Sequence, residues 1–191
     1  MNISFAKKKD NLTEDSSDNY NIIDKGNYSS IIFLLKVIVA TSYAFGLGYS
    51  LFFLGDDFIN VGKLFLVLLI ISYIFMEYPY AFIKALFLPK VLKKDNINLE
   101  INPFTMAIDI RSKVKISKVR IIFSLIVPCI IFAVIPTIAS YMLEFNIYLY
   151  VIASSAAIIS TKDIIYLLVI LKNYSLGDSI QLESNEFIFY K

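Results

Sequence analysis

The sequence predicts an integral membrane protein that is mainly α-helical, with four transmembrane helices and a small cytoplasmic β-sheet. Two observations support this fold class. Hydrophobic residues make up 58% of the 191-residue chain, which is more than a soluble domain of this size normally carries. These residues are also concentrated in four blocks, each near the ~20 residues that a helix needs to cross ~30 Å of hydrocarbon. The four blocks are residues 31–54, 63–88, 121–143 and 147–171.

The positions of the basic residues predict the topology. Lysine and arginine accumulate before the first block and between the second and third, whereas residues 55–57 and 144–146 contain neither. Because segments rich in these residues stay in the cytoplasm, we expect a multi-pass protein of the cell membrane with both termini cytoplasmic. Abundant Ile, Lys, Asn and Tyr are typical of an AT-rich bacterial genome. The basic residues are Lys7, Lys8, Lys9 and Lys25 before the first block, and Lys90, Lys93, Lys94, Arg111, Lys113, Lys115, Lys118 and Arg120 after the second.

The segment before the first block is polar. Residues 1–30 combine many Asp, Asn, Ser and Lys residues with few apolar ones, and such a composition buries too little surface to offset the entropy of ordering. We therefore expect a mobile cytoplasmic tail. The membrane domain follows over residues 31–175, and its first span is too long for a cleaved signal peptide, so we expect it to be retained. Ala44 and Gly48 lie about one helical turn apart in that span, which predicts a close helix contact.

A cytoplasmic β insertion is predicted between the second and third spans, over residues 95–118. Apolar and polar residues alternate over 97–102, Pro103 interrupts the pattern, and the alternation returns between 108 and 116. A period of two is typical of half-buried strands, and the proline predicts a turn between them. Residues 176–191 alternate in the same way around a polar turn. This C-terminal strand pair could join the same small sheet.

The third and fourth spans carry different signals. Pro128 and Pro136 predict a kinked third span, because proline removes a backbone donor from the helix. Residues 153–157 of the fourth span are small, which predicts a face where helix backbones approach closely. Spacing leaves open whether that contact lies within one chain or in an oligomer. Cys129 is the sole cysteine, so no intramolecular disulfide forms, and we expect it to serve in packing.

Ionisable side chains inside the spans are candidates for function, because charge within lipid is costly. Lys36 lies near the cytoplasmic end of its span, so we expect its ammonium group to extend toward the interface. The same behaviour is expected of Lys84. The five candidates are Lys36, Glu77, Lys84, Lys162 and Asp163.

Glu77 and Asp163 are predicted to share a depth in the membrane. Each lies seventeen residues after the expected outer start of its helix, at Asn60 and Asn146, which corresponds to about 25 Å of helical rise. Both carboxylates then lie in the cytoplasmic third of the bilayer. Lys162 could neutralise either acid, so a buried polar lock of Glu77, Lys162 and Asp163 and a functional site are both open interpretations.

The segment around Glu77 has the spacing of a zincin helix. In such a helix, two histidines at positions i and i+4 bind zinc, and the glutamate after the first histidine acts as general base. Residues 76–80 read Met-Glu-Tyr-Pro-Tyr, so the ligand positions hold Met76 and Tyr80 and only Glu77 fits. Pro79 would perturb the helix that aims the ligands. The chain contains no histidine anywhere.

In their order along the chain, these features resemble a family of small bacterial membrane proteins classed as putative zincin peptidases, which is distantly similar to the site-2 intramembrane metalloproteases. The resemblance covers most of the chain. After residues 76–80 come a basic segment at 115–120, a span with Pro128, and Ser-Thr-Lys-Asp at 160–163 ahead of the C-terminal strands. The resemblance implies that Glu77 matches the catalytic base and Asp163 the third zinc ligand. It also implies that Met76 and Tyr80 stand at the histidine positions, where thioether and phenol are poor zinc ligands.

The leading functional hypothesis is therefore a non-catalytic pseudo-peptidase that binds or regulates a membrane protein or peptide partner, for example in peptide immunity or as an exporter accessory. Its vestigial site comprises Met76, Glu77, Tyr80 and Asp163, with no catalytic residue, metal or cofactor expected. One alternative is an intramembrane metalloprotease with Glu77, Asp163 and Tyr80 as unusual ligands. Another is a small transporter or channel subunit, suggested by Lys162, Asp163 and the kinked third span. The lipid bilayer is an expected partner, an oligomer stays open, and no nucleic acid is expected.

Overall fold

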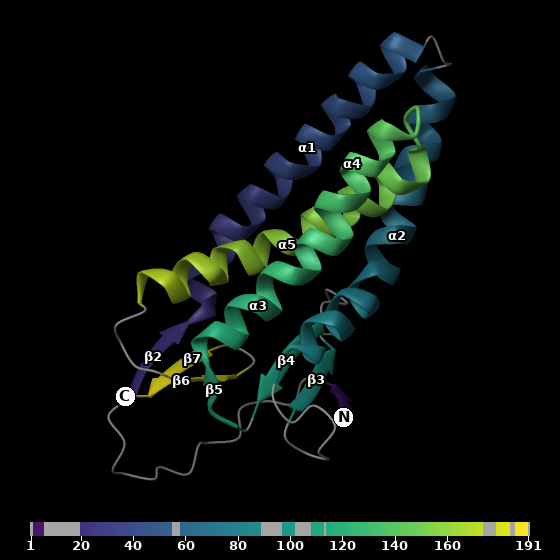
Figure 1. Ribbon diagram of the computed structural model, residues 1–191. Coiled ribbons are helices and arrows are strands. Elements are labelled where there is room, and N and C mark those ends of the chain that lie inside the picture. Colours follow the sequence, from purple (N-terminus) through teal and green to yellow (C-terminus); the bar gives the residue numbers. More distant parts are fainter. Residues whose placement is uncertain are drawn as a thin grey trace.

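The computed structural model describes residues 2–5, 20–54, 58–88, 97–101, 108–112, 114–173, 179–183 and 186–190, and Figure 1 shows their arrangement. Its four long helices are each long and apolar enough to cross a membrane, as the sequence predicts. They are α1 (Ser29–Leu54), which follows a short 3₁₀ helix η1 (Lys25–Tyr28), then α2 (Phe58–Leu86), a composite third helix, and α5 (Ile147–Lys172). The composite helix consists of α3 (Lys118–Cys129), the π-helical turn η2 (Ile130–Val134) and α4 (Ile135–Met142).

Helix α5 is the centre of the bundle. Of the most apolar window of each span, 56% is buried in α5, against only 6% in the first span. The small residues predicted as a contact face lie at this centre: Ala153, Ser154, Ser155 and Ala156 are fully buried. Ser155 Oγ also lies 2.9 Å from Ser72 Oγ of α2. Small side chains on α5 therefore let α2 approach within the same chain.

Helix α1 contacts α5 through an aromatic cluster near the far end of the bundle from the strands. Tyr150 Oη donates a hydrogen bond to the backbone oxygen of Tyr43 over 2.8 Å. Gly46 makes this approach possible, because a Cβ atom at this position would lie 2.4 Å from Tyr150 Oη. Ala44, one of the two small residues predicted to mark a contact face of α1, is exposed within this chain, whereas Leu47 is buried. The contact of α1 with α5 depends on Gly46 instead.

The third span is interrupted where its prolines predict. Pro128 lies inside α3 and Pro136 lies in the first turn of α4. The π-helical turn η2 separates them. Proline removes one backbone donor, and a π-helical turn is one way in which a helix accommodates that loss.

The strands form two sheets instead of the single small sheet that the sequence suggests. In the first sheet, β3 (Ile97–Ile101) pairs antiparallel with β4 (Ile108–Ser112), the predicted hairpin, and parallel with β1 (Asn2–Phe5). The second sheet has the order β2-β7-β6-β5 and is antiparallel throughout. Its strands are β2 (Tyr20–Asp24), β5 (Ile116–Ser117), β6 (Ser179–Leu182) and β7 (Glu186–Tyr190).

The expectation of a mobile N-terminal tail is wrong for the described parts of residues 1–30. Strand β1 pairs with β3, strand β2 pairs with β7 over five residue pairs, and residues 25–30 are helical. Composition alone misjudged this segment because its strands gain their hydrogen bonds from partners far away in the sequence. The remaining residues of this tail lie outside the described residues.

Both sheets lie at one end of the helices, and the C-terminal end of α1, the start of α2 and the α4–α5 connection lie at the other (Figure 1). Apolar residues from the strands and the helix ends share one core there, including Ile108, Ile116, Phe189, Ala85 and Ile170. An ion pair of 2.6 Å between Arg111 of β4 and Glu183, just after β6, links the two sheets. The sheet end is therefore part of the fold and holds β4 against the helices.

Candidate functional site

The zincin-like segment occupies the inward face of α2. Met76, Glu77, Tyr80 and Ala81 are all buried, whereas their neighbour Tyr78 is 52% exposed. These positions repeat at the three- and four-residue spacing of one helix face. Pro79 is accommodated inside α2, which continues to Leu86. The predicted perturbation by Pro79 does not end the helix.

A salt bridge between Lys84 and Asp163 lies at the centre of the site. Lys84 Nζ of α2 lies 2.5 Å from Asp163 Oδ1 of α5, and the side chains are 14% and 0% exposed. The expectation that Lys84 extends toward the interface was therefore wrong. Its position is one turn after Tyr80 on the inward face of α2, so its ammonium group meets the carboxylate of the neighbouring helix. A buried carboxylate this close to a lysine is a neutral pair rather than a free charge.

Glu77 interacts with the edge of β4. Its carboxylate accepts a hydrogen bond from the backbone N–H of Ile108, and it interacts electrostatically with Lys162 and Lys36. Lys162 Nζ in turn donates to the backbone oxygen of Ile108 over 3.4 Å. Both backbone groups of this residue, at the start of an edge strand, are thus satisfied by side chains from α2 and α5. Glu77 and Lys162 thereby hold β4 against the bundle.

The structure brings the predicted polar residues together but pairs them differently. Glu77 and Asp163 are close enough to interact electrostatically. The predicted lock assigned Lys162 to either acid, whereas the lysine bound to Asp163 is Lys84. Two participants were missed, Lys84 and the backbone of Ile108. The seven-residue spacing between Glu77 and Lys84 could have placed Lys84 on the same helix face.

Lys36 lies within the same electrostatic environment. Its Nζ donates a hydrogen bond of 3.1 Å to Tyr73 Oη of α2, and its Nζ lies 5.7 Å from the centre of the Tyr73 ring. Lys36 thus contacts another helix within the protein. Its expected extension toward the interface is replaced by this contact, because an aromatic hydroxyl lies within reach on α2.

Two buried polar atoms of the site belong to facing side chains of α2 and α5. They are Tyr80 Oη and Asp163 Oδ2. Tyr80 interacts with Asp163 electrostatically and through a side-chain hydrogen bond. The phenol and the carboxylate are therefore partners of each other inside the bundle.

The residues at the zincin-like spacing do not suit zinc. Zinc in proteins is bound by thiolate, imidazole and free carboxylate groups. Here one position carries the thioether of Met76, another the phenol of Tyr80, and the carboxylate of Asp163 is already bound to the ammonium group of Lys84. In the described part of the chain, no three His, Cys, Asp or Glu residues cluster in a way that could hold a metal ion. A bound cation would also be repelled by the lysine 2.5 Å from Asp163.

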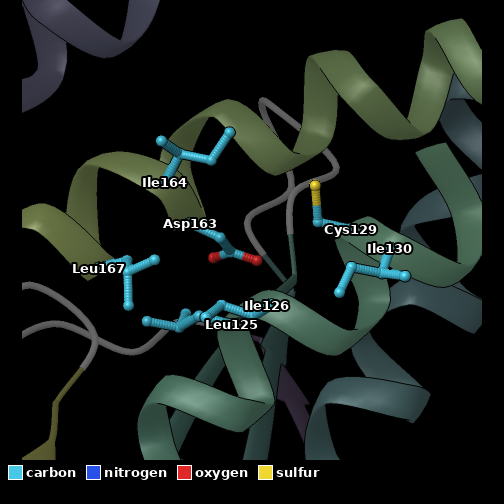
Figure 2. A pocket seen from close by; sticks show the side chains of 7 residues that line it. All are labelled: Leu125, Ile126, Cys129, Ile130, Asp163, Ile164 and Leu167. Atoms are coloured by element: carbon cyan, nitrogen blue, oxygen red, sulfur yellow. The ribbon is translucent and has the colours of Figure 1, made fainter. Parts of the chain in front are cut away.

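Asp163 also borders a pocket of about 190 Å³ between the third span and α5. Figure 2 shows its carboxylate directed from α5 toward α3, among apolar side chains that include Leu125, Ile126 and Leu167. Cys129, the sole cysteine, and Ile130 line the pocket where α3 passes into η2. Asp163 is thus the one carboxylate among lining residues that are otherwise apolar or a thiol.

Comparison with protein families places the chain among known sequences. A family model described as "Putative zincin peptidase" matches residues 73–175. No curated protein and no solved structure matches the chain. The matched region begins just before Met76 and includes β3, β4, β5, the third span and all of α5. Since it covers more than half of the 191 residues, the chain belongs to this family of putative zincin peptidases.

Proposed function

We propose that this chain is a non-catalytic, membrane-embedded member of its family that binds a membrane protein or peptide partner. The observation that carries the proposal is the 2.5 Å salt bridge between Lys84 and Asp163. It neutralises the carboxylate that would otherwise be the third metal ligand. We further propose that Met76 and Tyr80 stand at the two histidine positions of active relatives, in a scaffold distantly similar to that of the site-2 proteases. In this chain both side chains are buried in one cluster with Ala156 and Ile159 of α5.

Membrane insertion with both termini in the cytoplasm is part of the proposal. Strand β2 precedes α1 and strand β7 follows α5, and the two strands pair. Two segments that pair across an even number of spans must lie on the same side of the membrane. The basic residues Lys25, Arg111, Lys115 and Lys118 belong to the sheet end, while the connections at the other end contain no lysine or arginine. The sheet end is then cytoplasmic in a bacterial cell membrane.

The surface proposed for the partner is the outer edge of β2. Among the residues that the structure describes, this strand has only β7 as a neighbour in its four-stranded sheet, and Ile22 at its centre is 47% exposed. An exposed edge accepts an extended peptide as an additional strand. A cytoplasmic peptide segment of an exporter, or a peptide that the protein neutralises, would bind in this way.

Metal analysis tests the non-catalytic assignment. Purified wild-type protein should contain no stoichiometric zinc by inductively coupled plasma mass spectrometry. One tightly bound zinc ion per chain, removed only by a chelator, would sink the assignment. A triple variant with Met76→His, Tyr80→His and Lys84→Met restores two imidazoles and frees Asp163, so it should gain zinc. Failure of the correctly folded triple variant to do so would contradict the placement of Met76 and Tyr80 at the ligand positions.

A peptidase with unusual ligands is the second candidate, because the family match favours it. Tyr80 and Asp163 interact with each other inside the bundle, and Glu77 interacts electrostatically with both. Chelator-sensitive cleavage of a membrane peptide, abolished by Glu77→Gln and retained in Glu144→Gln at the opposite end, would establish this candidate. Absence of cleavage in both variants and in the wild type would leave the binding protein.

A further inference from the structure

The outer edge of β2 presents a defined pattern of side chains. Ile23 packs with Phe187 of β7 in the core between the strands and the helix ends. Because side chains alternate along a strand, Ile22 and Asp24 lie on the opposite face of the sheet, and both are exposed. A strand added beside β2 would place two of its own side chains next to Ile22 and Asp24. These two positions therefore determine which sequences fit the edge.

Two carboxylates lie opposite each other on this outward face. Asp24 pairs directly with Glu186 of β7, at the end of β2 that leads into η1 and α1. Like charges directly opposite each other in neighbouring strands destabilise a sheet. Among the residues that the structure describes, neither carboxylate forms a salt bridge with a lysine or an arginine. A cationic side chain from an added strand would relieve this repulsion.

The lysine next in sequence is directed elsewhere. Lys25 Nζ donates a hydrogen bond to the backbone oxygen of Glu183 and lies 4.7 Å from the centre of the Phe187 ring, which belongs to the inner face of the sheet. Asp24 Oδ1 accepts a hydrogen bond of 2.8 Å from the backbone N–H of Gly26. This bond caps η1 and fixes the carboxylate at the edge while the residue stays exposed. Asp24 is thus a positioned negative charge beside the outer edge of β2.

The direction of β2 favours one kind of membrane segment. The sheet is antiparallel throughout, and antiparallel pairing is slightly more stable than parallel pairing. Since β2 runs toward α1, an antiparallel neighbour runs away from the membrane. A cytoplasmic segment has this direction when it follows a transmembrane span. Such segments carry lysine and arginine close to the span, which is the level of Asp24.

We propose that the outer edge of β2 binds the cytoplasmic segment that directly follows a transmembrane span of a partner membrane protein. The segment adds as an antiparallel strand, with a lysine or arginine beside Asp24 and Glu186 and an aliphatic residue two positions later beside Ile22. This inference rests on the proposed function. It names the chemistry, the direction and the membrane position of the partner.

Fluorescence anisotropy on the full chain in phosphatidylcholine nanodiscs tests the inference. The probes are two fluorescein-labelled peptides with the cores Arg-Thr-Ile-Thr-Val and Glu-Thr-Ile-Thr-Val in identical Gly-Ser flanks, and empty nanodiscs give the background. The arginine peptide should bind about tenfold more tightly than the glutamate peptide, because one attracts the two carboxylates and the other repels them. Raising the salt to about 1 M should reduce this difference, since these charges are exposed to solvent.

Charge-neutral variants assign the preference to the two carboxylates. Asp24→Asn keeps an oxygen that caps η1, and combined with Glu186→Gln it removes both charges. The double variant should bind the two peptides within about twofold of each other. Glu144→Gln, an exposed acid at the other end of the bundle, should keep the tenfold preference. Ile22→Lys should weaken both peptides, because it places a charge where the aliphatic residue packs.

The remaining outcomes separate this inference from the proposed function. Equal affinity of the two peptides for the wild type overturns the basic partner but leaves a peptide site on β2. Two further arginine peptides are N-methylated at alternate residues, in the two possible phases. Wild-type affinity of both would overturn strand addition. A dimer in light scattering that Ile22→Lys dissociates would mean that a second copy occupies the edge, which also overturns the inference. If neither original peptide binds, β2 is not the partner site, while zinc analysis decides separately whether the protein is catalytic.

Discussion

The two ends of the helix bundle are held together by different chemistry. At the end away from the sheets, neutral hydroxyl groups connect the helices: Tyr150 donates to the backbone of Tyr43 over 2.8 Å, and Tyr43 Oη lies 2.8 Å from Thr137 Oγ1. At the sheet end, charged side chains connect α2 and α5. The hydroxyl groups at the end away from the sheets have hydrogen-bond partners, so a role in packing the helices explains them. Carboxylates are energetically costly inside a membrane-spanning bundle, which is why we assign the proposed function to the charged end.

The largest effect is expected from breaking the charged end on one side only. Asp163→Ala leaves the ammonium group of Lys84 buried without its carboxylate, so the free energy of unfolding should fall by about 3–5 kcal/mol. Unfolding in detergent, followed by circular dichroism, measures the change. The matched control is the double variant Lys84→Met with Asp163→Leu, which replaces the pair by apolar groups and should lie close to the wild type. A double variant as unstable as Asp163→Ala would show that the pair does more than compensate its own charges.

The neutral end should be broken most effectively at Gly46. A Cβ atom there would lie 2.4 Å from Tyr150 Oη and 3.3 Å from Tyr141 Oη, so Gly46→Ala should cost about 1–3 kcal/mol by displacing these rings. Gly62→Ala is the control, because a Cβ atom added there would meet nothing within 4 Å, and it should be neutral or stabilising by up to about 1 kcal/mol. Adding Tyr150→Phe should relieve part of the cost. Equal stability losses for the two glycine variants would contradict the close packing.

The variant Glu77→Gln tests the charged end in a second way, because glutamine removes the negative charge of Glu77 but keeps a side-chain oxygen that accepts hydrogen bonds. The Ile108 N–H retains a neutral partner, but Lys162 loses its negative neighbour, so stability should fall by about 1 kcal/mol. Hydrogen exchange of the Ile108 amide should accelerate, because β4 is held less firmly. Glu144→Gln, at an exposed acid beyond α4, should change neither quantity. Unchanged exchange at Ile108 would mean that Glu77 does not hold the strand.

The smallest effect is expected from the hydroxyl contact in the middle of the bundle. Ser155→Ala removes the 2.9 Å contact with Ser72, and interhelical hydrogen bonds of this kind average about 0.6 kcal/mol in membranes. Ser42→Ala is the control, since its hydroxyl is exposed and bonds only within its own helix, to Ile38. A loss several-fold above that of the control would place Ser155 among the essential contacts. Thermal unfolding in detergent measures the stability loss of each of the two variants.

The sequence predicted the helices well and their side-chain partners less well. Four apolar blocks are sufficient to locate the long helices, because hydrophobic length is a property of each segment alone. Lys84 shows the limit of this reasoning. Its distance from the end of the second block fits both an interfacial lysine and a buried one, and only the position of Asp163 on another helix decides between them. The pairing of charges across helices depends on helix rotation, which hydrophobicity leaves undetermined.

The strands show a second limit. The hairpin of β3 and β4 was predicted because its two strands are close in sequence and alternate clearly. Strands β1 and β2 were not, because their segment is polar and their partners lie about one hundred residues or more away. Strand β5 lies within the predicted insertion, but it has only two residues and pairs with β6 of the other sheet rather than with the predicted hairpin. Long-range backbone pairing therefore carried information that local composition could not supply.

The order along the chain of the strands in the four-stranded sheet also determines when this sheet can form. Its strand β2 precedes all four long helices in the chain, while β6 and β7 follow them. During synthesis at about 5–20 residues per second, β2 leaves the ribosome many seconds before its partner β7 exists. In the membrane topology proposed above, the sheet can close only after α5 has been made and its C-terminal end lies on the same side of the membrane as β2. In that topology, a chain in which any one helix failed to insert would place β7 on the opposite side of the membrane from β2, and the two strands could not pair.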